Sequence, residues 1–334
     1  MHFPKLFSLS LCSFAMIALA ASRGSAQQWS VPLYNIHLED PAGIHDRVNA
    51  ESVEFMPDGK TLVTAGFFYH AAKKKSVGEV CLRKVADGTL IATLRGTAKL
   101  YSLRAGSLAV ASTGKFIAAA GLTEERTWVV DIFDAATKKV VHTLIGDRSP
   151  ATCLAFSPDA KVLAVAHMKG TIELWGLHDG KLISSFAADK DEVWPVAFSP
   201  MGQFLATGNH DGSISFWNAK NCKKIGQIPP QPDLLDVAAV AFSPDGKLVA
   251  CGGLPKGEGV SPVYVWQIAQ SGKDNGNVIT TPQARFEGHR AYMYSLVFSP
   301  NSETLASANQ DATVKLWDLR MKKELATIVR HTDF

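Results

Sequence analysis

The sequence predicts an all-β chain folded as a β-propeller, built from six recognisable four-stranded units. Four of the units carry a Phe-Ser-Pro turn, and a later strand in each of them contains a tryptophan. These tryptophans, Trp175, Trp217, Trp266 and Trp317, are 42, 49 and 51 residues apart. Repeats of roughly 40 to 50 residues with four short strands are typical of propeller blades. A single blade cannot bury both of its faces, so neighbouring blades must cover them.

The first 26 residues have the three parts of a secretory signal peptide. Lys5 gives a positive start, residues 6–21 are almost entirely apolar, and small residues precede a cleavage site before Gln27. The apolar stretch is shorter than the ~20 residues that span a bilayer, which favours a cleaved signal peptide. The alternative is that the segment is retained as a membrane anchor. We expect a signal peptide over 1–26, a mature domain over 27–334 without a membrane span, and a periplasmic or extracellular location.

Charge and cysteine content argue against several classes of partner. Removing the first 26 residues takes away two basic residues and no acidic ones, which leaves 32 Lys and Arg against 31 Asp and Glu. A nearly neutral domain has no basic field to attract nucleic acid or an anionic membrane. The cysteines beyond the signal segment fall in different units, and we expect buried free thiols. Without Cys-x-x-Cys pairs or a haem motif, the sequence predicts no metal and no cofactor.

The third unit is the template for the other five. Residues 151–157 form an apolar first strand, 158–160 turn the chain through Pro and Asp, and 162–166 form the second strand. Residues 171–175 alternate polar and apolar side chains, as a half-exposed strand should. A hairpin turn with Asp-Gly then leads into the last strand, 182–186.

The other units follow the same order with local departures. Unit one has Arg83 where the tryptophan should stand, and unit two has Ser112-Thr113-Gly114 in place of Pro-Asp-Gly. Unit five has long loops, expected at 254–262 and 271–282. We place the repeats at approximately 48–95, 100–146, 150–187, 192–228, 236–286 and 291–330.

An extra strand is expected over residues 33–38, ahead of unit one. A closed ring needs its two ends joined, and one lone N-terminal strand can complete the last blade. Here the last unit already has an outer strand of its own, expected at 324–329. The sequence leaves two arrangements open, six closed blades or a ring with an incomplete seventh blade.

The sixth unit carries the motifs of a known family. It contains, in the order found in WD40 repeats, Gly288-His289, Phe298-Ser299-Pro300, Leu305-Ala306-Ser307, Asp311 and Leu316-Trp317-Asp318. From about Val48 onward the chain therefore resembles WD40-repeat β-propellers, and with its signal segment it looks like the exported bacterial type. The resemblance implies blades whose first strands line a central channel. It also implies a protein that binds protein or peptide partners.

The WD40 resemblance further implies a buried hydrogen-bonded tetrad of His, Ser or Thr, Asp and Trp within a blade. Unit six has all four residues, His289, Ser307, Asp311 and Trp317. Unit four has a partial tetrad without the histidine, Thr207, Asp211 and Trp217. A buried indole N–H needs an acceptor, so we interpret both sets as structural and not as a catalytic triad.

Candidate partner-binding residues lie where the chain enters the inner strands, because WD40-like proteins commonly bind partners on that face. The aromatic candidates are Trp194, Tyr292 and Tyr294, since rigid aromatic side chains dominate interface hot spots. Packing at the strand entrance is the alternative for Trp194 and Tyr294. The polar candidates are Glu51 and Thr152 at the same entrances, and Asn209, His210 and Asn309 beside the turns between second and third strands.

The sequence favours an exported, non-catalytic interaction scaffold, and two other classes stay open. An exported propeller enzyme of the hydrolase or lactonase kind would gather several carboxylates or histidines around the channel. The inner strands offer Glu51 and Glu54 and otherwise mainly small, hydroxyl or aromatic side chains, and no Gly-x-Ser-x-Gly motif occurs. The third class is a subunit or fragment of a larger envelope or cytochrome-associated assembly.

Overall fold

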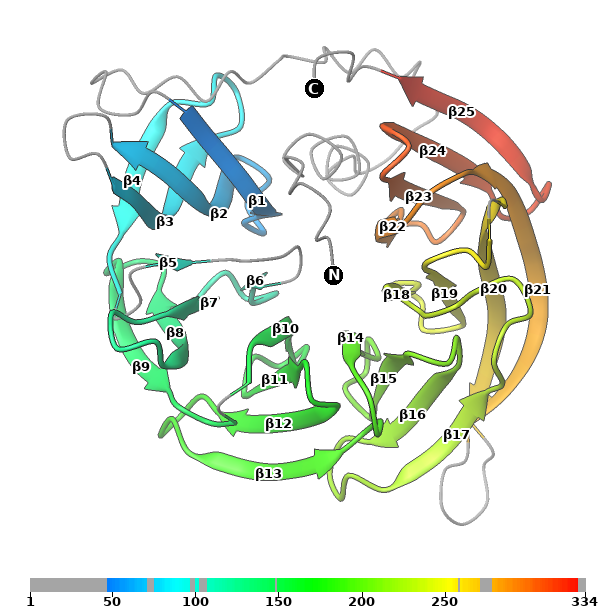
Figure 1. Cartoon of the computed structure of the whole chain (residues 1–334), viewed down its shortest axis with the longest axis horizontal. Helices are drawn as coiled ribbons and strands as arrows, with labels where there is room; N and C mark the ends of the chain where they lie inside the picture. The colour runs from blue at the N-terminus through cyan, green and yellow to red at the C-terminus, as the bar shows by residue number, and fades with distance from the viewer. Residues whose placement is uncertain are drawn as a thin grey trace.

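The computed structural model describes residues 47–70, 75–96, 100–101, 107–147, 149–257, 259–270 and 278–329. The described strands form six antiparallel sheets arranged around an axis as a six-bladed β-propeller (Figure 1). The predicted all-β propeller with six four-stranded blades is therefore confirmed. The expected signal segment 1–26 and the extra strand at 33–38 lie outside the described residues. Within the described ranges, no helix has the length and apolar character needed to cross a membrane.

Blades one to three follow one another along the chain, each running from an inner strand at the axis to an outer strand at the rim (Figure 1). The strands of blade one are β1 (Arg47–Phe55), β2 (Thr61–His70), β3 (Lys75–Lys84) and β4 (Leu90–Leu94). Those of blade two are β5 (Leu100–Tyr101), β6 (Leu108–Val110), β7 (Phe116–Leu122), β8 (Trp128–Asp134) and β9 (Lys139–Leu144). Those of blade three are β10 (Ala151–Phe156), β11 (Val162–His167), β12 (Thr171–Gly176) and β13 (Leu182–Ala187).

Blades four to six continue in the same sense. The strands of blade four are β14 (Val193–Phe198), β15 (Phe204–Asn209), β16 (Ile214–Asn218) and β17 (Lys224–Ile228). Those of blade five are β18 (Ala239–Phe242), β19 (Leu248–Gly252), β20 (Ser261–Gln270) and β21 (Val278–His289). Those of blade six are β22 (Met293–Phe298), β23 (Thr304–Asn309), β24 (Thr313–Asp318) and β25 (Lys323–Val329).

Two blades depart from the template. In blade two, β5 and β6 both pair with β7, so the first strand is present as two short pieces. In blade five, β20 starts at Ser261 and β21 starts at Val278, so strands occupy parts of both stretches expected as loops. The long β20–β21 hairpin keeps the antiparallel register up to the pair Gln270 and Val278.

Neighbouring blades are held together by shared clusters of buried apolar side chains. At the seam between blades three and four, Trp217 packs with Ala164 and Ala166. Equivalent clusters join blades one and two, two and three, four and five, and five and six. Each fully buried Leu or Phe in them contributes roughly 1.5–3 kcal/mol through burial. The described residues of blades six and one share no such cluster.

Candidate functional site: the inlet face of the propeller

One face of the propeller carries the connections from each outer strand into the next inner strand, and we call it the inlet face. The turns between second and third strands lie on the same face. The turns between first and second strands, such as 199–203 and 243–247, lie on the opposite face. Most of the residues predicted to bind a partner belong to the inlet face, so their burial and contacts decide which of them can do so.

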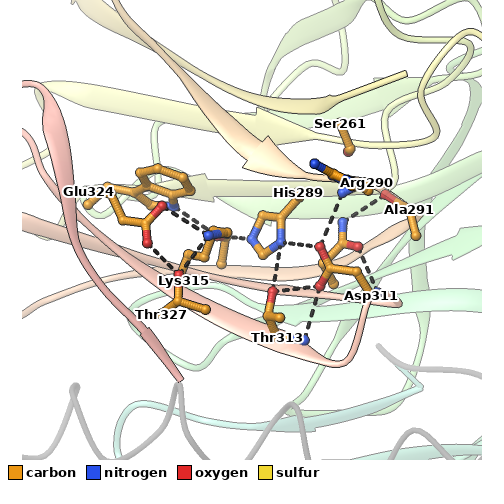
Figure 2. Close-up of polar contacts among 12 residues, drawn as sticks. Ser261, His289, Arg290, Ala291, Asp311, Thr313, Lys315, Glu324 and Thr327 are labelled. Atoms are coloured by element: carbon orange, nitrogen blue, oxygen red, sulfur yellow. Dashed lines mark hydrogen bonds and ion pairs between the residues drawn. The ribbon is translucent and has the colours of Figure 1, made fainter. Parts of the chain in front are cut away.

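In blade six the structure links the four residues of the predicted tetrad in a hydrogen-bonded chain. Trp317 Nε1 donates to Ser307 Oγ at 2.8 Å, and Ser307 Oγ lies 2.7 Å from His289 Nε2. His289 Nδ1 lies 3.0 Å from Asp311 Oδ2 (Figure 2). The chain is consistent if His289 is neutral, with Nδ1–H donating to the Asp311 carboxylate and Nε2 accepting from Ser307.

The Asp311 carboxylate is held by further donors at the start of β24. Thr313 Oγ1 donates to Asp311 Oδ1 at 2.6 Å, and the Arg290 backbone N–H donates to Asp311 Oδ2 at 3.1 Å (Figure 2). Burial alone would raise the pKa of Asp311, but the hydrogen bonds from His289 and Thr313 outweigh it and lower that pKa. Because Ser307 is completely buried, its hydroxyl cannot meet a substrate, and the set works as a framework.

In blade four the tryptophan N–H is bonded by a network of neutral side chains. Trp217 Nε1 donates to Thr207 Oγ1 at 3.0 Å, and Thr207 Oγ1 lies 3.4 Å from Asn209 Oδ1. The Asn209 amide donates to Ser213 Oγ at 2.8 Å and to Ser215 Oγ at 2.9 Å.

Asp211, predicted as part of this tetrad, lies outside the blade-four network. Its side chain is exposed, and its Oδ1 accepts the backbone N–H of Ser213 at 2.9 Å. An aspartate two residues before a turn donor commonly bonds its own main chain in this way. The amide of Asn209, which is only 5% exposed, holds the network together instead.

Blade three contains a buried network that the sequence motifs did not reveal. Glu173 Oε2 accepts from Trp175 Nε1 at 3.1 Å and lies 3.1 Å from His167 Nε2. Glu173 Oε1 accepts the backbone N–H of Asp147 at 2.8 Å, and His167 Nδ1 lies 3.2 Å from the Ser149 carbonyl oxygen. Val165 leaves the indole without a hydroxyl acceptor on β11, and the carboxylate from β12 takes that role. The sequence feature that could have indicated this network is Glu173, an acidic residue two positions before Trp175.

Three predicted polar candidates are placed so that a partner cannot reach them easily. Thr152 is buried, and its Oγ1 donates to the Val193 carbonyl oxygen at 2.6 Å, which ties β10 to β14. Asn309 is fully buried, and its Nδ2 donates to the Ala291 carbonyl oxygen at 2.7 Å. Asn209 is buried in the blade-four network. The side chain of Glu51 lies outside the described residues. Sequence position alone did not distinguish these anchoring roles from binding roles.

The three predicted aromatic residues lie together at the axis end of the inlet face, and we call them the aromatic cluster: Trp194, Tyr292 and Tyr294. The ring centroids of Trp194 and Tyr292 are 6.5 Å apart at an interplanar angle of 70°, and those of Tyr292 and Tyr294 are 5.7 Å apart at 64°. All three side chains are half-buried. Edge-to-face pairs of this kind are favourable arrangements of aromatic rings.

The aromatic cluster connects blade four to blade six across blade five. Trp194 stands four residues before the motif Phe198, and Tyr294 stands four before Phe298. The equivalent residue in blade five is Ala238, whose small side chain leaves room above β18. The aromatic cluster therefore forms because the small Ala238 of blade five stands between Trp194 of blade four and Tyr294 of blade six.

The central channel has limited means for acid–base chemistry in the described residues. Glu54 of β1 keeps part of its side chain open to water, and desolvation by the protein atoms gathered around its carboxyl group raises its pKa to about 7. Its charge adds to the rise of the pKa of Cys153 of β10, whose Sγ donates to the Val196 carbonyl oxygen of β14 at 3.7 Å. Burial raises the pKa of Cys153, so its thiol is a poor nucleophile at neutral pH. No group of three or more His, Cys, Asp or Glu side chains suited to a metal occurs within the described ranges.

Two family models of WD40 type match parts of this chain. The family described as "WD domain, G-beta repeat" matches residues 180–218, 232–254 and 280–318. A second family, "Anaphase-promoting complex subunit 4 WD40 domain", matches residues 138–196. The matched segments lie in blades two to six, and the segment 280–318 contains His289, Ser307, Asp311 and Trp317 of the blade-six tetrad. The matches support the WD40 repeat reading of the structure.

The similar curated proteins named below come from eukaryotes. The target of rapamycin complex subunit wat1 of Schizosaccharomyces pombe is 22% identical over 267 residues, which cover 80% of this chain and 77% of that protein. Coronin-7 of Mus musculus is 36% identical over 72 residues, 21% of this chain and 8% of coronin-7. The guanine nucleotide-binding protein subunit beta of Zea mays is 35% identical over 85 residues, 25% of this chain and 20% of that protein. The last two similarities each concern a small part of the relative.

Proposed function

We propose that this WD40-like propeller is a non-catalytic scaffold that binds a protein or peptide partner through the aromatic cluster on its inlet face. The observation that carries the proposal is the packing of Trp194 against Tyr292 and of Tyr292 against Tyr294, which links blade four to blade six. Half-buried tryptophan and tyrosine side chains supply large rigid contact area and are enriched among interface hot spots. Two of the similar proteins are named as subunits, which supports a role in assemblies.

A catalytic role has less support than binding. Ser307 is the serine that forms a Ser–His–Asp arrangement in the part of the chain that the structure describes, and it is completely buried. On the inner strands, the Cys153 thiol has a raised pKa, and among the described side chains Glu54 is the carboxylate whose charge acts on it. General acid–base catalysis needs positioned groups within reach of a substrate, and hydrolases of the propeller type gather several. The scaffold function therefore requires fewer assumptions.

Replacing Trp194 and Tyr294 together by alanine should abolish capture of the partner. Each truncated hot-spot aromatic costs about 2 kcal/mol or more, so the dissociation constant should rise on the order of a thousandfold. The measurement is affinity capture by the tagged full chain from an envelope fraction, quantified by mass spectrometry for wild type and variant.

The matched control for this experiment is Met201→Ser, because Met201 is 78% exposed and lies in a turn on the opposite face. The control should capture the partner as wild type does. Undiminished capture by the double variant would refute the proposed site. A large fall of the melting temperature in the double variant would instead assign Trp194 and Tyr294 to packing.

We also propose that the chain is exported. The support is the sequence of residues 1–26, with Lys5 ahead of an apolar run and small residues before Gln27. A mature protein purified from its native host should begin at Gln27 when its N-terminal peptide is measured by mass spectrometry. An N-terminal peptide that still contains residues 1–26 would count against cleavage.

A further inference from the structure

We infer that the inlet-face connection between β9 and β10 is a pH-sensitive switch, held to blade three only while His167 carries a proton on both ring nitrogens. Three observations carry the inference: the two acceptors that face the ring, the close approach of the connection to Glu173, and a small cavity beside the ring. The switch lies in a different part of the inlet face from the aromatic cluster and does not depend on the proposed function.

His167, the buried last residue of β11, faces a hydrogen-bond acceptor with each of its ring nitrogens. Its Nε2 lies 3.1 Å from Glu173 Oε2, and its Nδ1 lies 3.2 Å from the Ser149 carbonyl oxygen. A carbonyl oxygen and an ionised carboxylate have no proton to donate, so both ring nitrogens must donate. A histidine with two N–H groups is an imidazolium cation.

The Glu173 carboxylate is the charged partner in this pair. Burial alone would raise the pKa of Glu173, but the hydrogen bond and charge of His167, followed by the bonds from Asp147 and Trp175, lower it. The carboxylate is therefore ionised near neutral pH and has no proton to give to the ring. Buried charges in proteins are normally paired, and the imidazolium of His167 supplies the opposite charge here.

The ion pair holds the connection at two points. The Asp147 backbone N–H donates to Glu173 Oε1 at 2.8 Å, and the Ser149 carbonyl oxygen accepts from His167 Nδ1. A neutral ring has a single N–H, so it would leave either Ser149 or Glu173 without its donor. The carboxylate would then be a buried charge without a cation, and local opening that returns it to water would cost less.

The connection packs tightly on the pair but has a small cavity beside it. A Cβ atom at Gly146 would collide with the Glu173 carboxylate, so only glycine allows this approach. The cavity leaves about 10 Å³ for the centre of a water molecule, and Trp128, Gly146, Ser149, His167 and Glu173 are among the residues that line it. Trp128 and Gly146 are half-exposed, so the cavity lies where water from the inlet face can reach the ring.

Among the described side chains around the cavity, His167 is the one cationic group. The other titratable groups that line it are Glu173 from β12 and Asp147 from the connection, and both are acids. Lys169, in the turn after β11, is exposed and does not line the cavity, and Arg148 lies outside the described residues. The strands β8, β9 and β10 contribute only side chains that do not titrate, Trp128, Val129, Val130, Leu144 and Ala151.

The charge of His167 is tested by nitrogen NMR on the full chain, isotope-labelled in its histidine rings. At about pH 7 both ring nitrogens of His167 should have the chemical shift of a protonated nitrogen. His289 is the internal comparison, because its Nε2 accepts from Ser307 and should appear as a bare nitrogen. The variant His167→Gln assigns the signals by removing them. A bare ring nitrogen on His167 would overturn the inference.

The switch itself is tested by hydrogen exchange at the backbone amide of Asp147. Its protection factor, corrected for the intrinsic exchange rate, should fall at least about tenfold between about pH 6 and about pH 9, since histidine loses its second proton there and a charge-assisted hydrogen bond goes with it. The matched control is the amide of Ala188, which donates to the Gly170 carbonyl oxygen at 2.8 Å in the connection between blades three and four. The control should keep its protection, and constant protection at Asp147 would show that no switch exists.

The variant His167→Gln separates this ring from other groups that titrate in the same range. Glu54, with a pKa of about 7, also changes its charge between these pH values. In His167→Gln the protection of Asp147 should be lower than in wild type at about pH 6 and should no longer depend on pH. A pH dependence that persists in the variant would assign the effect to another group and overturn the inference. The wild-type spectra decide the charge of His167 whether or not the variant folds.

Discussion

Replacing Trp317 by alanine lowers the expected free energy of unfolding by about 3–5 kcal/mol, the usual cost of truncating a buried tryptophan. Trp317 is 1% exposed and belongs to the cluster that joins blades five and six. Its ring stacks on Phe286 with centroids 5.1 Å apart at 25°. The variant would leave a cavity at the seam and remove the donor to Ser307. Equilibrium unfolding in urea, followed by circular dichroism, measures the loss.

Two further variants separate the parts of this effect. Trp317→Phe keeps much of the apolar contact but removes the indole N–H, so it should cost less than alanine, about 1–3 kcal/mol. Trp194→Ala changes a half-buried side chain of the aromatic cluster and should cost less than either. An unfolding midpoint of Trp317→Ala equal to that of wild type would contradict the burial seen at the seam.

Replacing Glu173 by leucine is expected to cost about 3–5 kcal/mol as well, because it breaks a buried pair by removing one partner. The substitution leaves the N–H groups of Trp175 and Asp147 and the ring of His167 without the carboxylate that satisfies them. The same urea experiment measures the effect. Glu303→Leu is the matched control, since Glu303 is exposed and should change stability by less than about 0.5 kcal/mol.

The stability difference between wild type and Glu173→Leu should depend on pH. Burial by itself would raise the pKa of Glu173, but the hydrogen bond and charge of His167 and the bonds from Asp147 and Trp175 lower it below the ordinary value of 4.5. A lowered pKa in the folded state contributes stability that is present above the unfolded value and is lost as the pH falls through the folded pKa. The difference should therefore shrink on going from pH 7 to below pH 4.5. A constant difference would show that the carboxylate charge is not what stabilises blade three.

Turn chemistry and repeated apolar strands were enough to predict the architecture. Pro158 and Asp159 mark the turn between β10 and β11, and the same pattern located the other blades. Even the divergent turn at Ser112-Thr113-Gly114 lies between β6 and β7, because its glycine supplies the positive φ of 71° that the turn requires. Local residue preferences act within a few positions, so a single sequence can reveal them.

Roles that depend on strand pairing could not be predicted in the same way. Thr207 meets Trp217, and His167 meets Glu173, only because the antiparallel register brings β15 beside β16 and β11 beside β12. A motif read along the chain assigned the polar role to Asp211, whose side chain turns to solvent.

The tryptophan N–H groups of blades three, four and six are held by chemically different hydrogen-bond networks. In blades three and six the indole depends on a carboxylate, directly through Glu173 or by way of His289 and Asp311. In blade four it depends on Thr207 and Asn209, which carry no charge. Protonation at acidic pH would therefore weaken the tryptophan hydrogen bonds of blades three and six, which are not adjacent. The hydrogen bonds of blade four, which carries Trp194 of the aromatic cluster, would stay intact.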